Sequence, residues 1–242
     1  MTFSGPYNSP LALGARPWGS LFFSIWALFL ISPAVQGLML IVDPAFTELA
    51  MQGETVEGFR ARWSLILLGY VATLFLTMSW AEMIGAGPFA GSMKTNTKWL
   101  LTGLIGGPLV LSVTSVLVSL AMSGSDPNWQ LNDAADERAF SAEATAGFAF
   151  MFAVVFLAPI LEEIGYRGIG LGCLLSRGWD AWGSAFVVTI LFTLAHTHFT
   201  PVALIPIFLT GLFFAWLRIQ SGAVAPSIVA HIAANAFLYL QQ

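Results

Sequence analysis

Long uncharged hydrophobic runs alternate with short polar stretches along the whole chain. A helix needs about 20 mostly apolar residues to cross the roughly 30 Å hydrocarbon core of a bilayer. The runs cover residues 17–42, 64–81, 99–122, 146–175, 181–196, 201–217 and 222–240. Their residues are continuously apolar rather than alternating, which favours helices over a closed β-barrel. The pattern predicts an all-α, polytopic transmembrane bundle of about seven (six to eight) spans.

Composition supports a membrane protein without a separate soluble domain. Of the 242 residues, 57% are hydrophobic and 9% are charged, whereas soluble domains carry about 25% charged residues. We therefore expect residues 1–242 to form a single integral membrane domain, with the motif-bearing core in residues 146–242. The first run is too long for the apolar region of a signal peptide, so we expect an uncleaved first helix with a kink at Pro33.

Charge and cysteine content exclude several function classes. The formal net charge is −4, and no basic stripe is present to neutralise phosphates, so we expect no nucleic-acid partner. The single cysteine, Cys173, rules out an intramolecular disulfide and a paired-cysteine metal site. An apolar-flanked cysteine of this kind is typical of a small core residue.

The distribution of basic residues predicts an orientation. Cytoplasmic loops carry an excess of Lys and Arg. With seven alternating spans, the side that holds the N-terminus carries Arg16, Lys94, Lys98, Arg177 and Arg218, and the opposite side carries Arg60, Arg62 and Arg138. We therefore expect a cytoplasmic N-terminus in a bacterial cytoplasmic (inner) membrane. The two longer polar loops, residues 43–63 and 123–145, are then extracytoplasmic.

The fourth hydrophobic run contains three ionisable residues, Glu162, Glu163 and Arg167. Charges inside a bilayer are costly, so each marks a functional or pairing role. Glu163 and Arg167 lie four residues apart on one helical face and are expected to pair. Glu162 lies about 100° away around the helix and cannot make the same contact. A carboxylate left without a cation in a low-dielectric site suits a general base.

Other polar groups lie near the ends or middles of later runs. His196 ends the fifth run, and His231 and Asn235 lie four residues apart within the seventh. With Glu162 these residues make a hydrolytic set, in which the carboxylate deprotonates water, one imidazole positions it, and the His/Asn pair donates to a developing oxyanion. Glu162, His196 and His231 are also a chemically suitable zinc-ligand set, with water in the fourth position. The residue types leave both interpretations open.

Structural interpretations compete with the catalytic one. Intramembrane His and Asn residues often form interhelical hydrogen bonds, and a proton relay in a transporter uses the same residue types. No inverted repeat supports a transporter. His198 is expected to be a boundary residue next to a polar turn, and the Gly103/Gly107 and Gly168/Gly172 spacings indicate helix packing.

Three motifs occur in a fixed order along the second half of the chain. They are Glu-Glu-x-x-x-Arg at Glu162, Glu163 and Arg167, Phe-x-x-x-His at Phe192 and His196, and His-x-x-x-Asn at His231 and Asn235. This ordered set resembles the CPBP family of intramembrane proteases, which includes CAAX prenyl endopeptidases and bacteriocin-processing proteins. The resemblance covers residues 162–235.

The resemblance implies a helical membrane fold in which the motifs meet in an intramembrane cavity. It implies that Glu162 and His196 activate water and that His231 and Asn235 stabilise the oxyanion, with Glu163 and Arg167 in support. The family has been described both as metalloproteases and as glutamate-dependent proteases, so a divalent metal such as zinc is one expectation. The implied partners are the lipid bilayer and a membrane-associated protein or peptide substrate. The rival hypothesis is a non-proteolytic membrane scaffold or a bacteriocin-immunity-type protein.

Overall fold

The described part of the chain is helical. A computed structural model describes residues 30–31, 33–52, 55–83, 93–123, 147–176 and 178–241, and these contain no β-strand. The separate helices are α2 (Pro44–Met51), α3 (Val56–Met83), α4 (Thr97–Ser123), α9 (Ala181–Leu194), α10 (Leu204–Ser221) and α11 (Ala225–Tyr239). One long helix comprises α6 (Gly147–Met151), η2 (Phe152–Leu157), α7 (Ala158–Glu162), η3 (Glu163–Gly170) and α8 (Leu171–Ser176). The predicted all-α class is confirmed.

Four of the described helices are long and apolar enough to cross a bilayer. They cover Val56–Ser79, Thr97–Met122, Gly147–Leu175 and Leu204–Ser221. Three shorter apolar helices, Pro33–Val42, Ala181–Leu194 and Ala225–Tyr239, coincide with the first, fifth and seventh predicted runs. The chain is therefore an integral membrane protein, and seven remains the predicted number of spans. Residues 17–29 and Ser32 lie outside the described residues, so the kink expected at Pro33 stays a prediction.

The first predicted polar loop is instead largely helical. Within residues 43–63, Pro44–Met51 form α2 and the residues from Val56 on form the first turns of α3. The Asp43 carboxylate accepts a hydrogen bond from the Phe46 backbone N–H at 3.0 Å, and Pro44 begins the helix, which is a favourable N-terminal combination. Apolar side chains of α2 then pack on Ala61 and Leu65 of α3. Capping and burial together explain why this charged segment folds. Residues 124–145 of the second predicted loop lie outside the described residues.

The long helix is continuous but contains two π-helical stretches, η2 and η3. Pro159 follows η2 closely; proline lacks an N–H and its ring clashes with the carbonyl four residues earlier. A local change to the wider π-helix relieves that clash, and such stretches are frequent at functional sites. The second stretch starts at Glu163, and all eight of its residues are buried. The fourth predicted run is thus one element with an altered helical register at the charged motif.

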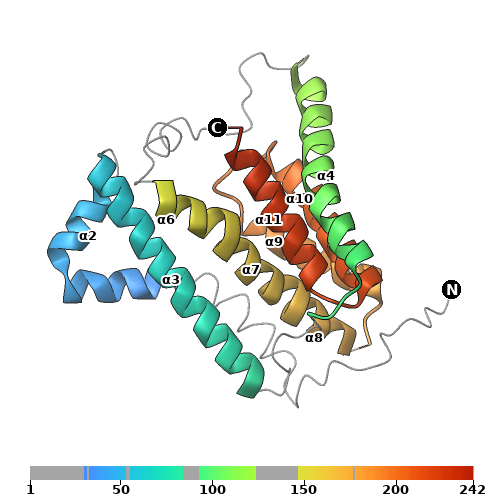
Figure 1. Ribbon diagram of the computed structural model, residues 1–242, viewed down its shortest axis with the longest axis horizontal. Helices are drawn as coiled ribbons and strands as arrows, with labels where there is room; N and C mark the ends of the chain where they lie inside the picture. Colours follow the sequence, from blue (N-terminus) through green and yellow to red (C-terminus); the bar gives the residue numbers. More distant parts are fainter. Residues whose placement is uncertain are drawn as a thin grey trace.

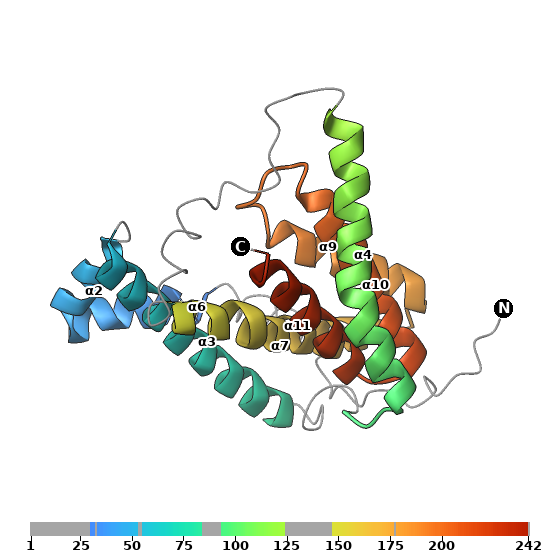
Figure 2. The same cartoon turned by 45° about the horizontal axis from the view of Figure 1, so that its top comes forward.

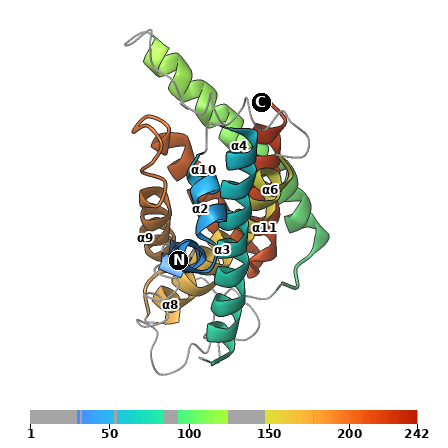
Figure 3. The same cartoon turned by 90° about the vertical axis from the view of Figure 1, so that its left-hand side faces the viewer.

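The long helix lies between α3 on one side and α11 with α4 on the other (Figure 1). Turned views show α9 and α10 beyond α11 (Figure 2) and α3 running across the opposite side (Figure 3). The largest core cluster joins residues of η3 and α8 to α9, α10 and α11, and includes Ile164, Ile169, Val188, Ala215 and Ile228. The helices that carry the three motifs therefore share one core.

Helices α4 and α11 approach each other closely at two glycines of α4. A Cβ atom at Gly103 would collide with the Pro226 carbonyl oxygen, and one at Gly107 would collide with the Ala230 carbonyl oxygen. The glycine spacing seen in the sequence therefore does serve packing, as small residues commonly do between membrane helices. Ala230 directly precedes His231, so this contact also fixes the position of a motif residue.

We expect Gly107→Ala to destabilise the protein by about 1–3 kcal/mol, because the added methyl group overpacks a backbone contact. Unfolding measured in detergent micelles checks the prediction. Gly37→Ala is the matched control, because no atom lies within 4 Å of its Cβ position, and alanine is favoured over glycine in a helix. Equal stability of the two variants would contradict the close contact.

Candidate active site

Glu163 and Arg167 form the ion pair that their helical spacing predicts. Arg167 Nη1 donates to Glu163 Oε1 at 2.9 Å, and both side chains are fully buried. Arg167 Nη2 donates to the Gly211 carbonyl oxygen of α10 at 2.9 Å. The guanidinium also lies over the Phe192 ring, with 4.3 Å from Cζ to the ring centroid. One charged residue of the long helix therefore contacts both α9 and α10.

Gly211 makes room for this guanidinium. A Cβ atom at Gly211 would lie 3.0 Å from Arg167 Nη2, 3.0 Å from Thr189 Cγ2 and 3.1 Å from Phe192 Cδ1. These separations are tighter than ordinary packing contacts. The sequence offered no signal for this role, because the contact joins residues that lie far apart in the chain.

Arg218 was expected in a loop, but it lies within helix α10. Helix α10 continues to Ser221, and the Arg218 side chain is buried with Nε donating to the Arg167 carbonyl oxygen at 3.2 Å. A buried arginine is tolerated where it finds acceptors such as carbonyls inside the bundle. It supports the π-helical stretch η3 and does not count among the basic loop residues that predict orientation.

Glu163 has a second partner, which the sequence did not indicate. His231 Nδ1 of α11 lies 3.0 Å from Glu163 Oε1. Because this carboxylate is paired with Arg167, it accepts and the imidazole N–H donates. The His231 ring also stacks on Phe214, with 4.8 Å between ring centroids. Spacing within one helix predicts pairs along that helix only, so this contact between helices emerges only in the fold.

His196 lies just beyond the end of its helix. Helix α9 ends at Leu194, two residues earlier than the predicted run. The His196 Nδ1 lies 2.8 Å from the Phe192 carbonyl oxygen, and a carbonyl only accepts, so Nδ1 carries the hydrogen. The ring of Phe192 lies 4.6 Å from that of His196 between centroids. The Phe-x-x-x-His motif thus fixes both the orientation and the tautomer of the imidazole.

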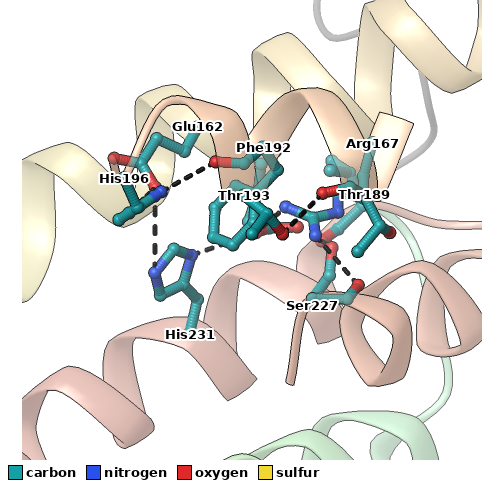
Figure 4. Close-up of polar contacts among 11 residues, drawn as sticks. Glu162, Arg167, Thr189, Phe192, Thr193, His196, Ser227 and His231 are labelled. Carbon is teal, nitrogen blue, oxygen red and sulfur yellow. Dashed lines mark hydrogen bonds and ion pairs between the residues drawn. The ribbon is translucent and has the colours of Figure 1, made fainter. Parts of the chain in front are cut away.

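Glu162 lies opposite both imidazoles (Figure 4). Its Oε2 is 4.0 Å from His196 Nε2 and 3.9 Å from His231 Nε2, and its side chain is 22% exposed. Since the two Nδ1 atoms carry the hydrogens, both Nε2 atoms present lone pairs toward the carboxylate. These distances are too long for direct hydrogen bonds. They suit a water molecule that lies about 2.8 Å from the carboxylate oxygen and from one imidazole nitrogen and donates one hydrogen to each.

Glu162, His196 and His231 are also the residues that the sequence suggests as metal ligands. A carboxylate and two imidazoles, each with its other ring nitrogen anchored, are chemically suitable for zinc. Ligand atoms about 2.0–2.1 Å from a tetrahedral zinc ion lie about 3.3 Å apart, whereas the separations here are 3.9 and 4.0 Å. No cluster of three His, Cys, Asp or Glu residues suited to a metal occurs within the described ranges. The separations are thus about 0.6–0.7 Å longer than those between zinc ligands, and a metal at these residues stays a prediction.

Asn235 shares the face of α11 that carries His231, as predicted, but it contacts another part of the long helix. Its Nδ2 donates to the Val154 carbonyl oxygen in η2 at 2.9 Å. No direct contact with Glu162 is found. The amide retains a second N–H for another acceptor. The fourth predicted catalytic residue is therefore positioned by η2, two turns before Glu162.

Three further residues, His198, Tyr70 and Tyr166, lie near the site. His198 is exposed in the turn after α9, with its ring 5.9 Å from that of His196 between centroids. Two phenols that the sequence analysis did not single out, Tyr70 and Tyr166, interact electrostatically with Glu162. Tyr166 lies one turn after Glu162, which the sequence does indicate. Tyr70 belongs to α3, and no motif connects it to the site.

Comparisons with known proteins agree with the position of the motifs. Residues 144–237 match a family model described as type II CAAX prenyl endopeptidase Rce1-like. This segment contains all three motifs, and the match supports the resemblance to the CPBP family of intramembrane proteases. The segment is less than half of the chain, and α3 and α4 lie outside it.

A similar protein is the "Uncharacterized 24.3 kDa protein" of Escherichia coli. It is 34% identical over 87 residues, which is 35% of this chain and 40% of that protein. The aligned segment thus spans less than half of the relative's length. No solved structure matches the chain.

We expect Arg167→Ala to lower the free energy of unfolding by about 3–5 kcal/mol, because it leaves the buried Glu163 carboxylate without its cation. Unfolding in detergent micelles measures the loss. The double variant Glu163→Gln with Arg167→Met is the control. It removes both charges and should recover much of the stability, whereas a double variant as unstable as Arg167→Ala would show that charge pairing is not the cause.

Proposed function

We propose that this protein is an intramembrane endopeptidase that hydrolyses a peptide bond in a membrane-associated protein or peptide. One observation carries the proposal: Glu162 faces the Nε2 lone pairs of His196 and His231 at distances that suit a shared water. The match of residues 144–237 to an Rce1-like endopeptidase model supports it. The substrate class follows from the bilayer location of the site.

Glu162 is the general base in this proposal. As the water oxygen forms a bond to the scissile carbonyl carbon, a water proton passes to Glu162 and the carbonyl electron pair moves to the oxygen. Glu162 then returns the proton to the amide nitrogen as the carbon–nitrogen bond breaks. His196 accepts the second water hydrogen through Nε2 and so orients the attacking lone pair. The bilayer surroundings exclude bulk water, which strengthens these interactions.

His231 and Asn235 stabilise the oxyanion in the proposal. The free amide N–H of Asn235 donates directly. His231 donates through Nε2 once Glu162, whose Oε2 lies 3.9 Å away, passes the water proton to it, and the Glu163 carboxylate on Nδ1 stabilises the resulting imidazolium. The proton returns to Glu162 before Glu162 protonates the amide nitrogen, so a single proton accounts for both steps. This arrangement resembles the way a buried aspartate orients the histidine of serine hydrolases. Glu163 and Arg167 are therefore positioning residues, since they act through His231.

We propose a bacterial cytoplasmic membrane location with a cytoplasmic N-terminus. With Arg218 buried in α10, the basic residues in loops and at span ends number four on the N-terminal side and three on the other. This excess still favours the same orientation. His196 lies at the end of α9 that faces the extracytoplasmic side in this orientation. Cleavage on that side follows from the proposal.

We expect Glu162→Gln to abolish cleavage while the protein still inserts and folds. Glutamine keeps the shape but cannot take a proton, and Glu162 makes no direct hydrogen bond that the fold requires. The measurement compares protein termini in host membranes that contain wild-type protein or the variant at matched expression. Glu48→Gln, an exposed change on α2, is the control. Identical termini in wild type and Glu162→Gln would instead favour the scaffold hypothesis.

The metal question has its own test. Because the geometry suits water better than zinc, we expect the cleavage that depends on Glu162 to persist in purified protein treated with 1,10-phenanthroline. Cleavage rates before and after treatment provide the measurement. Loss of cleavage that added Zn²⁺ restores would contradict this expectation and would show that Glu162, His196 and His231 move together by about 0.6 Å to bind the ion.

A further inference from the structure

The proposed mechanism leaves the site short of hydrogen-bond donors. His231 already donates its Nδ1 hydrogen to Glu163, and His196 donates its own to the Phe192 carbonyl oxygen. One Asn235 N–H is used by Val154. Before any proton transfer, the second N–H of Asn235 is the remaining donor that these three described residues offer to an oxyanion. Oxyanion sites commonly combine two or more donors.

Tyr70 lies on the inner face of α3. Trp63, Ile66, Leu67 and Tyr70 repeat at helical spacing and pack against one aromatic cluster, so they share one face. The cluster includes Phe150 and Ala153 of the long helix, and Val154 packs against it as well. Val154 is the residue whose carbonyl oxygen holds Asn235. The Tyr70 ring and the Asn235 amide thus both lie near residues 150–154 of the long helix.

The next turn of α3 packs against a part of the core that lies closer to Glu162. Leu74, four residues after Tyr70, packs against the core cluster that includes Ile164. Along the long helix, Glu162 lies between the segment 150–154 and Ile164. Helix α3 therefore runs along the stretch of the long helix that contains Glu162, and the electrostatic interaction between the Glu162 carboxylate and the Tyr70 phenol is consistent with this geometry.

The hydroxyl of Tyr70 remains open to a ligand. The side chain is half-buried, and its oxygen is not among the fully buried polar atoms without a partner. Within the described ranges we find no hydrogen bond from this phenol. Tyr166 differs, because its hydroxyl is fully buried without a partner and its ring edge packs on Phe192 at 5.6 Å between centroids. Of the two phenols, Tyr70 is the one whose hydroxyl is not fully enclosed by the protein.

We propose that Tyr70 is a further catalytic residue, whose phenol O–H donates to the scissile carbonyl oxygen and to the oxyanion that develops from it. The inference rests on the proposed function. The phenol keeps its proton throughout, so the proton balance of the Glu162 mechanism is unchanged. It also gives α3, which lies outside the matched segment 144–237, a direct part in the reaction.

The test is Tyr70→Phe, which removes one oxygen and keeps the ring that packs on the aromatic cluster. We expect the initial rate of cleavage to fall about a hundredfold, as it does when one oxyanion donor is lost, while thermal unfolding in detergent is unchanged. The substrates are the host-membrane proteins whose cleaved termini appear with wild type and disappear with Glu162→Gln. The rate is the appearance of those termini after induction.

Tyr239→Phe is the matched control. Tyr239 packs against the same aromatic cluster as Tyr70, with its ring 6.1 Å from that of Phe150 between centroids. The same atom is removed, so we expect a wild-type cleavage rate. A fall in rate with Tyr70→Phe but not with Tyr239→Phe supports the inference.

The outcomes separate the two proposals. If Glu162→Gln abolishes the termini and Tyr70→Phe produces them at the wild-type rate, the role of Tyr70 is overturned and the protease proposal stands. If the termini are the same with Glu162→Gln as with wild type, both proposals fail. A third outcome is that Tyr70→Phe and Tyr239→Phe are equally slow and both unfold at a lower temperature than wild type. That result would overturn the catalytic role of Tyr70 and would show that its hydroxyl serves packing.

Discussion

The double use of the Glu163 carboxylate is the interaction on which the site depends. One oxygen, Oε1, accepts from Arg167 Nη1 and from His231 Nδ1, so the charge that would be costly inside a bilayer is compensated from its own helix and used to orient another. Arg167 in turn reaches the Gly211 carbonyl oxygen of α10. The long helix, α10 and α11 are thus tied together at one buried point. Glu162, the next residue back, remains free to face the two imidazoles because its neighbour satisfies the structural requirement.

The π-helical stretch η3 begins at the point where two adjacent glutamates differ in burial. In η3 the wider turn begins at Glu163, and every residue of that stretch is buried, whereas Glu162 ends the ordinary α-helical turn before it and is partly exposed. Adjacent residues of a helix point about 100° apart, so one carboxylate is buried and paired while its neighbour stays accessible, and the register changes between the two. The carbonyl groups that a wider helix presents also find partners, since Arg218 donates to the Arg167 carbonyl oxygen and Asn235 to that of Val154. Side chains from other helices therefore stabilise the irregular backbone at both stretches, as is required inside a membrane.

The sequence predicted those features that hydrophobic periodicity and spacing within one helix can indicate. The hydrophobic runs located the helices, and spacing within one helix predicted the Glu163–Arg167 pair and the leftover Glu162. Contacts between helices leave no local signal in the sequence. The fold was therefore needed to find the His231–Glu163 hydrogen bond, the space that Gly211 leaves for Arg167 and the burial of Arg218. Residues 43–63 were misjudged because charge count suggested a loop, while the Asp43 cap and the apolar face of α2 determined a helix. The assembly of Glu162 with His196 and His231 was expected from the resemblance, and the fold supplies the reason: each imidazole is anchored through Nδ1.

Helices α3 and α4, which lie outside the matched segment, help to position the helices that carry the three motifs. The motifs lie on the long helix, α9 and α11, but α11 owes its position to α4, whose Gly103 and Gly107 permit backbone contact with Pro226 and Ala230. The side of the long helix away from α10 is covered by α3, through the aromatic cluster of Phe59, Trp63 and Phe150. A membrane interior gives little hydrophobic drive for helix association, so close packing and hydrogen bonds must position these helices. The geometry around Glu162 is therefore a property of the packed bundle, in which α3 and α4 hold the motif-bearing helices to within the distances that water-mediated chemistry requires.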